Sequence, residues 1–341
     1  MRCDKRCAAG LAIFLLCVVS PAIASSVHSS VHQILVYRKK YVMGTVFEIA
    51  AYDPSPERAS KAIEEAFREV VRLDDLLSNY KSDSALSHLN RSAHFHTETI
   101  PPDLYVLIEQ TLQYSRLSEG EFDISVAPLV DLWKAALSGD SMPAMSQIEQ
   151  ARNCVGYQKI ELTPPDQITF RSPCLRLDVG AIGKGYATDR AADLLHSWGI
   201  RNALINAGGS TIVAMGSPPG QAGWLLQARD PSHKIDPQIM LKDESLSTSE
   251  QTAPTLLGKE SAGHIIDPNT GMPLRTEFAV SVVAKTGTES DALSTSLLLL
   301  GPAKGRTMIK DMAGVSALWI SPEARIETAT GGPQIRLPKD P

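Results

Sequence analysis

The sequence predicts an α+β fold, a layered α/β sandwich in which mixed sheets are flanked by helices. Two observations predict it. Segments rich in β-branched and aromatic residues alternate along the chain with segments of helical hydrophobic periodicity. The composition, with 43% hydrophobic and 21% charged residues, is that of a globular protein. A chain of 341 residues can bury a large core, so its stability requires neither a metal nor a disulfide.

The first predicted elements after residue 40 are a strand and a long amphipathic helix. The strand covers Tyr41–Ala51, which is rich in β-forming residues. Ser55 can cap a helix that has Pro56 at its first position. The apolar stripe of this helix contains Ile63, Phe67, Val70 and Leu77.

The remaining elements follow from the same criteria. Helices are predicted at 102–118, 128–137, 146–153, 184–198, 290–300 and 303–312. Strands are predicted at 158–162, 167–170, 203–206, 211–215, 224–229, 245–248, 280–284 and 315–320. Thr163-Pro-Pro-Asp166 is typical of a turn and is expected to close a hairpin. There is no internal repeat, and the Pro/Gly-rich stretch 216–223 does not define a domain boundary.

The first 24 residues have the pattern of a secretory signal. A basic stretch, residues 2–6, precedes the apolar run Ala8–Val19, and Ala22-Ile-Ala24 offers the small residues that signal peptidase accepts. A run of about 12 residues is too short to span a bilayer, which takes about 20. Residues 1–24 are therefore predicted to be cleaved, and the mature chain is expected to be a soluble protein of an exported, oxidising compartment such as a periplasm.

The five cysteines agree with export and leave one question open. Three of them lie within residues 1–24, and a lipoprotein modified at Cys17 is disfavoured because bulky Leu16 stands where a small residue is expected. Cys154 and Cys174 remain in the mature chain. They form either a disulfide after export or two buried free thiols.

The charge of the chain excludes one class of partner. The formal net charge is −5, and lysine and arginine are not concentrated in any segment of the mature chain. Because binding to nucleic acid phosphates depends on such a concentration, no nucleic-acid partner is expected.

A glycine-rich turn lies between a predicted strand and a predicted helix. Gly180-Ala-Ile-Gly-Lys-Gly185 follows the strand Leu175–Val179, where backbone N–H groups at a helix start can hold a phosphate. A Walker A sequence requires Ser or Thr where Gly185 stands, and a dinucleotide fingerprint requires Gly where Thr188 stands. The segment is therefore either an anion-binding turn that carries Lys184 or simply a tight turn.

Two further groups of polar residues are candidates for chemistry. Asp291 and Thr295 lie four apart on a predicted helix, so their oxygens share one face and suit Mg²⁺. Alternatively, the aspartate caps the helix and the threonine bonds its own backbone. His264 precedes an Asp-Pro/Thr-Gly turn and is either a base near neutral pH or a structural residue.

Eight motifs occur in a fixed order between residues 40 and 301. They are Met43-Gly-Thr45; Leu77-Ser-Asn-Tyr80 with Asp83-Ser84; Gly120–Ser125 with Pro128–Trp133; Leu177–Tyr186 with Asp189; Asn206-Ala-Gly-Gly209; Thr248-Ser249; His264–Pro268 with Thr270-Gly271; and Asp291-Ala-Leu-Ser-Thr295. In this order they resemble the ApbE-type flavin transferases, the FAD:protein FMN transferases. The resemblance implies one such domain over residues 25–341, with the fold of that family.

The resemblance implies a Mg²⁺-dependent enzyme. Such an enzyme cleaves the pyrophosphate of FAD, transfers the FMN moiety to a Thr or Ser hydroxyl of a target protein and releases AMP. FAD is thus a substrate, and the acceptor is expected to carry a Ser/Thr-Gly-Ala/Ser-Thr-type motif, as in a membrane redox subunit.

The resemblance also implies roles for individual residues. Flavin and adenosine contacts map to Met43, Tyr80, Glu121, Phe122, Asp123, Asp178, Lys184 and Ile265. Metal contacts map to the Ala181 carbonyl, Asp291 and Thr295, with Ser294 beside them. The implied catalytic residues are His264, as the base, and Asp291, as the charged metal ligand.

Two departures from the family pattern leave alternatives open. Glu250 and Gln251 follow Thr248-Ser249, where the family usually has glycine, and Ser210 follows Gly209, where an acidic or amide residue is frequent. Both changes fall where they can alter the substrate pocket or the acceptor. The alternative functions are hydrolysis of FAD to FMN and AMP, and non-catalytic flavin binding in the periplasm.

Overall fold

The computed structural model describes residues 32–139, 141–251, 255–256, 259–261, 264–276, 278–330 and 335–336. The chain from Gln33 onward forms one compact unit. The predicted signal peptide, residues 1–24, lies outside the described residues. Within the described part, no helix is both long enough and apolar enough to cross a membrane.

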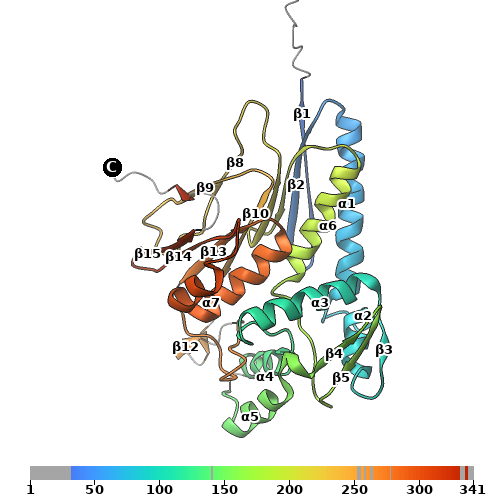
Figure 1. The fold of residues 1–341 in the computed structure, drawn as a ribbon, viewed down its shortest axis with the longest axis vertical. Helices are drawn as coiled ribbons and strands as arrows, with labels where there is room; N and C mark the ends of the chain where they lie inside the picture. Colours follow the sequence, from blue (N-terminus) through green and yellow to red (C-terminus); the bar gives the residue numbers. More distant parts are fainter. Residues whose placement is uncertain are drawn as a thin grey trace, which may run out of the picture. The chain divides into compact units, whose positions relative to one another are not determined.

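An eight-stranded sheet forms the centre of this unit, with strand order β1-β2-β6-β7-β10-β13-β14-β15 (Figure 1). Its strands are β1 (Ile34–Val42), β2 (Thr45–Asp53), β6 (Asn202–Ala207), β7 (Thr211–Met215), β10 (Glu244–Glu250), β13 (Ala279–Ala284), β14 (Ser316–Ile320) and β15 (Ile326–Thr330). All neighbouring strands pair antiparallel. Among the described residues, parallel pairing is limited to the isolated bridge between Val126 and Arg176.

Layers cover both faces of the large sheet. Helices α1 (Pro56–Leu77), α6 (Gly183–Ser197) and α7 (Gly287–Ile309) lie side by side on one face (Figure 1). Side chains alternate along β13, so Val280 and Val282 pack with α7 while Val283 points to the other face. That second face is covered by the small sheet of β8 (Trp224–Gln227), β9 (Gln238–Leu241) and β16 (Ile335–Arg336). The predicted α+β class with helix-flanked sheets is therefore confirmed.

The predicted strand Tyr41–Ala51 is wrong in one respect, because the chain reverses within it. β1 and β2 form a hairpin whose turn is Met43-Gly44, with φ of 52° and 72°. Positive φ at both turn residues matches the twist of a two-residue hairpin. The β-forming residues on both sides concealed this turn, since methionine is not a usual turn residue.

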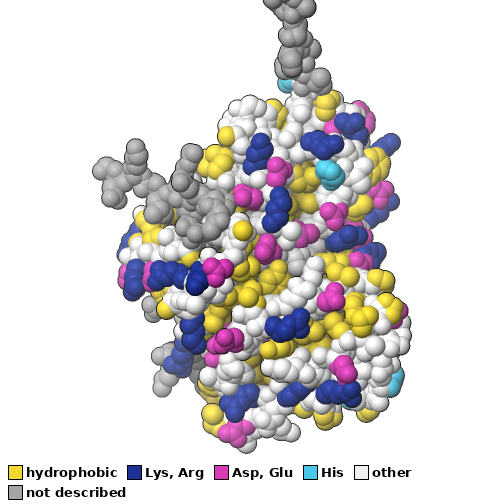
Figure 2. All heavy atoms as spheres, in the orientation of Figure 1, with side chains coloured by type: hydrophobic (Ala, Val, Ile, Leu, Met, Phe, Trp, Pro, Cys, Tyr) yellow, Lys and Arg dark blue, Asp and Glu magenta, His cyan; other side chains and the backbone are white. Residues whose placement is uncertain are grey.

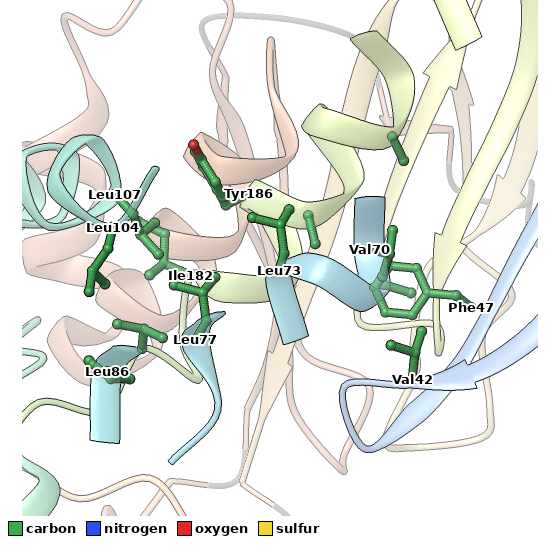
Figure 3. Packing of buried hydrophobic residues seen from close by; sticks show 14 of the residues in the cluster. Val42, Phe47, Val70, Leu73, Leu77, Leu86, Leu104, Leu107, Ile182 and Tyr186 are labelled. Carbon is green, nitrogen blue, oxygen red and sulfur yellow. The ribbon is translucent and has the colours of Figure 1, made fainter. Parts of the chain in front are cut away.

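The amphipathic helix that follows is confirmed as α1. Ser55 accepts a hydrogen bond from the N–H of Arg58, and Pro56 occupies the first helical position. The predicted apolar stripe is buried in a core that continues from the sheet to the next helices (Figure 3). This core includes Val42, Phe47, Val70, Leu73, Leu77, Leu86, Leu104, Leu107, Ile182 and Tyr186.

A second group of elements lies at one end of the large sheet (Figure 1). It contains α2 (Ala85–Ser92), α3 (Pro102–Leu117), α4 (Ala127–Ser138), α5 (Met145–Cys154), a 3₁₀ turn (Tyr157–Lys159) and the strands β3 (Glu98–Thr99), β4 (Ile160–Thr163) and β5 (Gln167–Phe170). The predicted turn at 163–166 is confirmed, because Thr163 pairs with Gln167. The short elements α2 and β3 were not predicted.

The last helix confirms the predicted break near residue 301. α7 contains Gly301 in a non-helical conformation with φ of 70°, followed by Pro302. The helix begins earlier than predicted, at Gly287, because Thr286 caps it by accepting the N–H of Glu289. Strands β9, β11 (Thr255–Leu256), β12 (Lys259–Ser261), β15 and β16 were not predicted.

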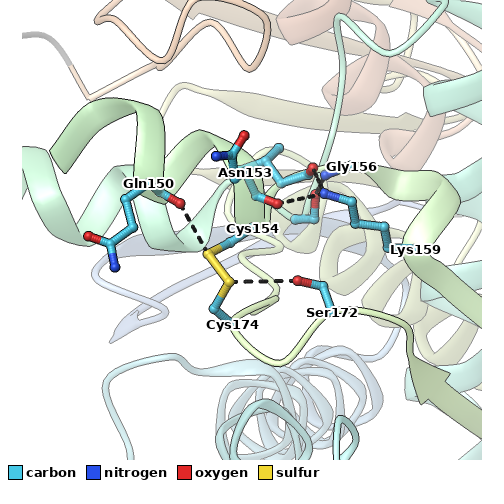
Figure 4. The surroundings of a disulfide bond; sticks show 9 residues. Gln150, Asn153, Cys154, Gly156, Lys159, Ser172 and Cys174 are labelled. Atoms are coloured by element: carbon cyan, nitrogen blue, oxygen red, sulfur yellow. Dashed lines mark hydrogen bonds between the residues drawn. A yellow bond between two sulfur atoms is a disulfide. The ribbon is translucent and has the colours of Figure 1, made fainter. Parts of the chain in front are cut away.

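Cys154 and Cys174 form a disulfide, with their Cα atoms 5.2 Å apart (Figure 4). The open question about these cysteines is thereby answered. The bond joins the end of α5 to the segment that precedes Leu175.

On the face of the molecule in Figure 2, basic and acidic side chains are interspersed.

Candidate active site

A cavity of about 410 Å³ collects residues that lie far apart in the sequence. All the predicted site residues line it except Met43 and Ser294. Those that do are Tyr80, Glu121, Phe122, Asp123, Asp178, Ala181, Lys184, His264, Ile265, Asp291 and Thr295. The fold therefore brings the predicted residues to one place.

The two exceptions lie directly beside this cavity. Met43, in the β1–β2 turn, lines a neighbouring cavity of about 370 Å³ whose wall also includes Tyr80 and Lys184. Ser294 lies behind the wall on α7, where its hydroxyl donates to the carbonyl of Asp291 and pairs with the hydroxyl of Ser249.

The glycine-rich turn sets the contact between α6 and α7. A Cβ on Gly185 would lie 2.2 Å from the carbonyl oxygen of Gly287 and 2.8 Å from the Cβ of Asp291. Only glycine allows the two helices to approach so closely. This helix contact, rather than a phosphate loop of standard spacing, explains why residue 185 is glycine. It also brings Lys184 and Asp291 to the same wall of the cavity.

Asp291 is buried, and its environment excludes the capping alternative. Its side chain is 5% exposed, and Oδ2 accepts the N–H of Gly185 at 2.9 Å. Burial raises the pKa of this carboxyl, while the charge of Lys184 and the hydrogen bond from Gly185 oppose the rise. Thr286, not Asp291, caps α7. The carboxylate is thus directed between the two helices and toward the cavity.

The oxygen donors around Asp291 fit a hard divalent cation. The Thr295 hydroxyl lies on the same face of α7, 3.1 Å from the hydroxyl of Ser249. Ala181, whose backbone carbonyl is the third oxygen that the family resemblance implies, lies in the same cavity wall. One carboxylate, one hydroxyl and one carbonyl are ligands that Mg²⁺ accepts. Among the described residues, His, Cys, Asp and Glu side chains form no cluster of three or more that could hold a metal. The donor set itself contains neither Cys nor His, which are the usual ligands of zinc.

His264 lies at the cavity with an exposed side chain, so it is not a core histidine. Partial burial of the imidazole, with the positive charges of Lys184 and Lys134, lowers its pKa. A lowered pKa keeps the ring neutral near pH 7, which is the state that can accept a proton.

The loop that holds Glu121, Phe122 and Asp123 is built by its own side chains. The two carboxylate oxygens of Asp123 accept the N–H groups of Ser125 and Tyr157, each at 2.7 Å. Burial raises the pKa of Asp123, and these hydrogen bonds oppose the rise. Asp123 therefore shapes the cavity wall with both of its oxygens already in use.

Asp178 performs a similar task at the start of α6. Its Oδ1 accepts the N–H of Gly180 at 2.8 Å, and its own N–H donates to the carbonyl of Ile124 at 2.7 Å. The predicted strand Leu175–Val179 is wrong, because this segment forms only the isolated bridge of Arg176 with Val126. The turn that Asp178 closes joins the glycine-rich turn to the loop that contains Phe122.

Two basic residues of the cavity were not predicted. Lys134 donates to the hydroxyl of Tyr80 at 3.0 Å, and its ammonium lies 4.9 Å from the centre of that ring. Arg229 forms an ion pair with Glu250, which explains how the cavity accommodates the unusual carboxylate after Thr248-Ser249. Ser210, the other departure, lines the cavity and donates to the carbonyl of Ala207.

The chain is similar to known proteins over most of its length. The model of the ApbE family matches residues 43–319. An FAD:protein FMN transferase from Treponema pallidum (strain Nichols) is 28% identical over 315 residues, which cover 86% of each chain. One from Escherichia coli (strain K12) is 28% identical over 279 residues, 79% of each chain.

A solved structure extends the likeness to three dimensions. The crystal structure of Pseudomonas stutzeri flavinyl transferase ApbE in its apo form superposes with a TM-score of 0.76 at 25% identity. The match covers 88% of this chain and 96% of that one. The family model spans most of the sequence, and the cavity residues lie within the matched range. The chain therefore belongs to the ApbE family.

Proposed function

We propose that this protein is an FAD:protein FMN transferase that depends on Mg²⁺. It transfers the FMN moiety of FAD to a Thr or Ser hydroxyl of a target protein and releases AMP. The observation that carries the proposal is the single cavity in which Lys184 at a helix start adjoins the oxygen donors Asp291, Thr295 and Ala181. The names of the relatives support the same reaction.

The residues of the cavity have the chemistry to bind FAD. Lys184 lies in the first turn of α6, where the helix dipole and free N–H groups favour a phosphate. The ring of Tyr80 is 84% exposed, and such an aromatic surface can stack against a flat ring system. The second cation, Lys134, is bound to Tyr80 and adds positive charge on the same side.

The reaction replaces the phosphoanhydride oxygen on the phosphorus of FMN with a phosphoester oxygen. The acceptor hydroxyl oxygen forms a bond to the phosphorus of FMN, and the bond from this phosphorus to the oxygen of AMP breaks. His264 takes the proton of the hydroxyl, and AMP leaves with the electron pair. When bound, Mg²⁺ supplies positive charge against the phosphate oxygens, and Asp291, Thr295 and the Ala181 carbonyl would hold it.

We further propose that the enzyme works after export, in the periplasm, on a membrane redox subunit with a Ser/Thr-Gly-Ala/Ser-Thr-type motif. The signal-like residues 1–24 and the disulfide Cys154–Cys174 support this location, because disulfides persist in oxidising compartments. N-terminal sequencing of the exported protein should read Ser25-Ser-Val-His28. An intact Met1 or a lipid on Cys17 would contradict it.

The test of the reaction is incubation with FAD, Mg²⁺ and a domain that carries the acceptor motif. Transfer gives a flavin-fluorescent band of the acceptor and an equal amount of AMP. An acceptor with alanine at the modified position is the control. FMN and AMP formed equally with either acceptor indicate hydrolysis, and bound but unchanged FAD indicates a flavin-binding protein.

A further inference from the structure

Gln251 follows the last residue of β10, and its side chain reaches the segment that carries His264. The carboxamide oxygen accepts the N–H of Ile265 at 3.1 Å. The carboxamide nitrogen donates to the carbonyl of Ile265 at 3.0 Å and to the carbonyl of Leu274 at 3.1 Å. One side chain therefore pairs with both backbone groups of the residue next to His264.

These bonds hold the base of a loop. The N–H of Leu274 donates to the carbonyl of Ile265 at 2.8 Å, and Ile266 forms a bridge with Pro273. The two ends of this loop thus lie side by side, and Gln251 joins both of them to the end of β10.

The far end of the same loop has separate attachments. The indole of Trp133 donates to the carbonyl of Gly271 at 2.8 Å, and Arg152 donates to the carbonyl of Asn269. Both anchors lie several residues from His264. In the part of the chain that the structure describes, the side chain that hydrogen-bonds to the backbone next to His264 is the amide of Gln251.

Gln251 is placed to act on the cavity without entering it. Its neighbour Glu250 and its hydrogen-bond partner Ile265 both line the cavity, whereas Gln251 is not one of the residues of the cavity wall. From this place the side chain of Gln251 can orient Ile265 in the cavity wall, but it does not itself form part of the wall. Glutamine suits this task because its carboxamide offers a donor and an acceptor in fixed geometry. These match the backbone carbonyl and the backbone N–H of Ile265.

We infer that Gln251 is a positioning residue that holds His264 at the cavity through the backbone of Ile265 and makes no contact with FAD. The inference rests on the proposed function, in which His264 accepts the proton of the acceptor hydroxyl. It assigns a role to one of the two residues that depart from the family pattern after Ser249.

The test is a double-mutant cycle of Gln251→Met and His264→Ala, with FAD affinity and the transfer rate constant measured separately. Methionine keeps the length of glutamine and removes its hydrogen bonds. Gln251→Met should lower kcat of transfer roughly 10- to 100-fold, the scale of a misplaced catalytic group, and leave the Kd of FAD unchanged. In the His264→Ala background it should cause no further loss. Gln113→Met, an exposed glutamine on α3, is the matched control and should change neither quantity.

Gln251→Glu provides a second variant if the methionine variant does not fold. Its carboxylate still accepts the N–H of Ile265 but faces two carbonyl oxygens, so the same pattern is expected. Equal losses in both backgrounds, or weaker FAD binding, would overturn the inference while the proposed function stands. A wild-type protein that transfers no FMN would overturn both.

Discussion

The carboxylate of Asp291 lies almost fully buried, where a charge is costly unless positive charge or hydrogen bonds lie close to it. The N–H of Gly185 and the ammonium of Lys184 supply part of this stabilisation. A divalent cation held by Asp291, Thr295 and the carbonyl of Ala181 would supply the rest. A raised pKa of the Asp291 carboxyl without a bound cation is therefore what we expect of an oxygen-rich metal site.

Removing the two proposed side-chain ligands, Asp291 and Thr295, should have unequal effects. Asp291→Ala removes the formal charge of the donor set and should abolish Mg²⁺-dependent transfer at ordinary Mg²⁺ concentrations. Thr295→Ala removes a neutral ligand that water can replace, so excess Mg²⁺ should restore much of the rate, at a requirement raised roughly 10-fold or more. A Mg²⁺ titration of both variants in the presence of FAD measures this. Full-rate transfer by EDTA-treated wild type would contradict it.

The pH dependence of transfer should follow His264. Burial and the charges of Lys184 and Lys134 lower the pKa of its imidazole, so the neutral base persists to a lower pH than usual. Lys134→Met removes one of these charges. The pKa of His264 should then rise, and the acidic limb of the pH profile of kcat at saturating FAD should move to higher pH.

The matched control for this shift is Lys61→Met, an exposed lysine on α1. The pKa itself can be followed through the imidazole proton signals by NMR. If the acidic limb moves to lower pH, or stays in place while the NMR titration also stays, Lys134 does not act on His264.

At the scale of residues, the sequence was sufficient to identify side chains that are close together because they lie on the same helix. Asp291 and Thr295 lie four apart, so any helix places them on one face. Lys134 lines the cavity and donates there to the hydroxyl of Tyr80, which lies 54 residues away. Arg229 likewise reaches it through Glu250. Local pattern carries no information on such contacts, because tertiary packing creates them.

At the scale of elements, the close approach of α6 and α7 brings Lys184 and Asp291 to one wall of the cavity. Asp189 of α6 strengthens this approach, since its carboxylate accepts the N–H groups of Gly287 and Thr288 at the start of α7. The helices were predictable from periodicity. Their contact was not, because it depends on Gly185 meeting Gly287 across more than 100 residues.

Gly185→Ala should therefore destabilise the protein and weaken its site together. The new Cβ would overlap the backbone of Gly287, and overpacking of this kind costs roughly 1–3 kcal/mol or more. Moving α7 also moves Asp291, so the Mg²⁺ requirement should rise. Urea unfolding gives the stability, with an unchanged m value expected.

Gly183→Ala is the matched control for that variant, two residues earlier in the same helix. A Cβ there would meet Val179 and Met43 at ordinary distances of 3.6 and 3.8 Å. Its unfolding free energy should change by about 1 kcal/mol or less, in the direction of greater stability, because alanine favours a helix. Equal destabilisation by both substitutions would show that the helix contact is not the cause.

At the same scale, the hairpin at Met43-Gly44 shows what pattern cannot reveal. The residues on both sides favour strands, so their pattern continues across the turn. The reversal requires positive φ at two positions. It places Met43 beside the cavity rather than in the middle of a strand.

At the scale of the whole molecule, the cavity lies where the large sheet with its helices meets the second group of elements. The sheet side contributes Asp291, Thr295 and Ser249, while the other side contributes the loop Glu121–Asp123 and Lys134. The alternation of strands and helices predicted the layers. It could not predict which two parts would enclose the site.

The disulfide lies within the second group of elements and joins two of its segments near the cavity. Directly after Cys154, the N–H groups of Gly156 and Tyr157 donate to Ser125 and Asp123. Shortly after Cys174, Arg176 forms a bridge with Val126, and Asp178 donates to Ile124. The two segments that the disulfide joins therefore both pair with residues 123–126, of which Asp123, Ile124 and Val126 line the cavity.

Breaking the disulfide should consequently affect both stability and FAD binding. Its cysteines are 20 residues apart, and a loop of this length corresponds to about 3 kcal/mol of stability in chain-entropy terms. Cys154→Ala combined with Cys174→Ala should lower the unfolding free energy by about that amount and raise the Kd of FAD. Reduction of the wild type should have the same effect, since Cys174 is exposed to a reductant, and the double variant should not respond to the reductant. Urea unfolding and quenching of flavin fluorescence measure the two quantities. A loss of stability with unchanged FAD affinity would mean that residues 123–126 keep their place without the bond, and that the disulfide stabilises the fold without supporting the site.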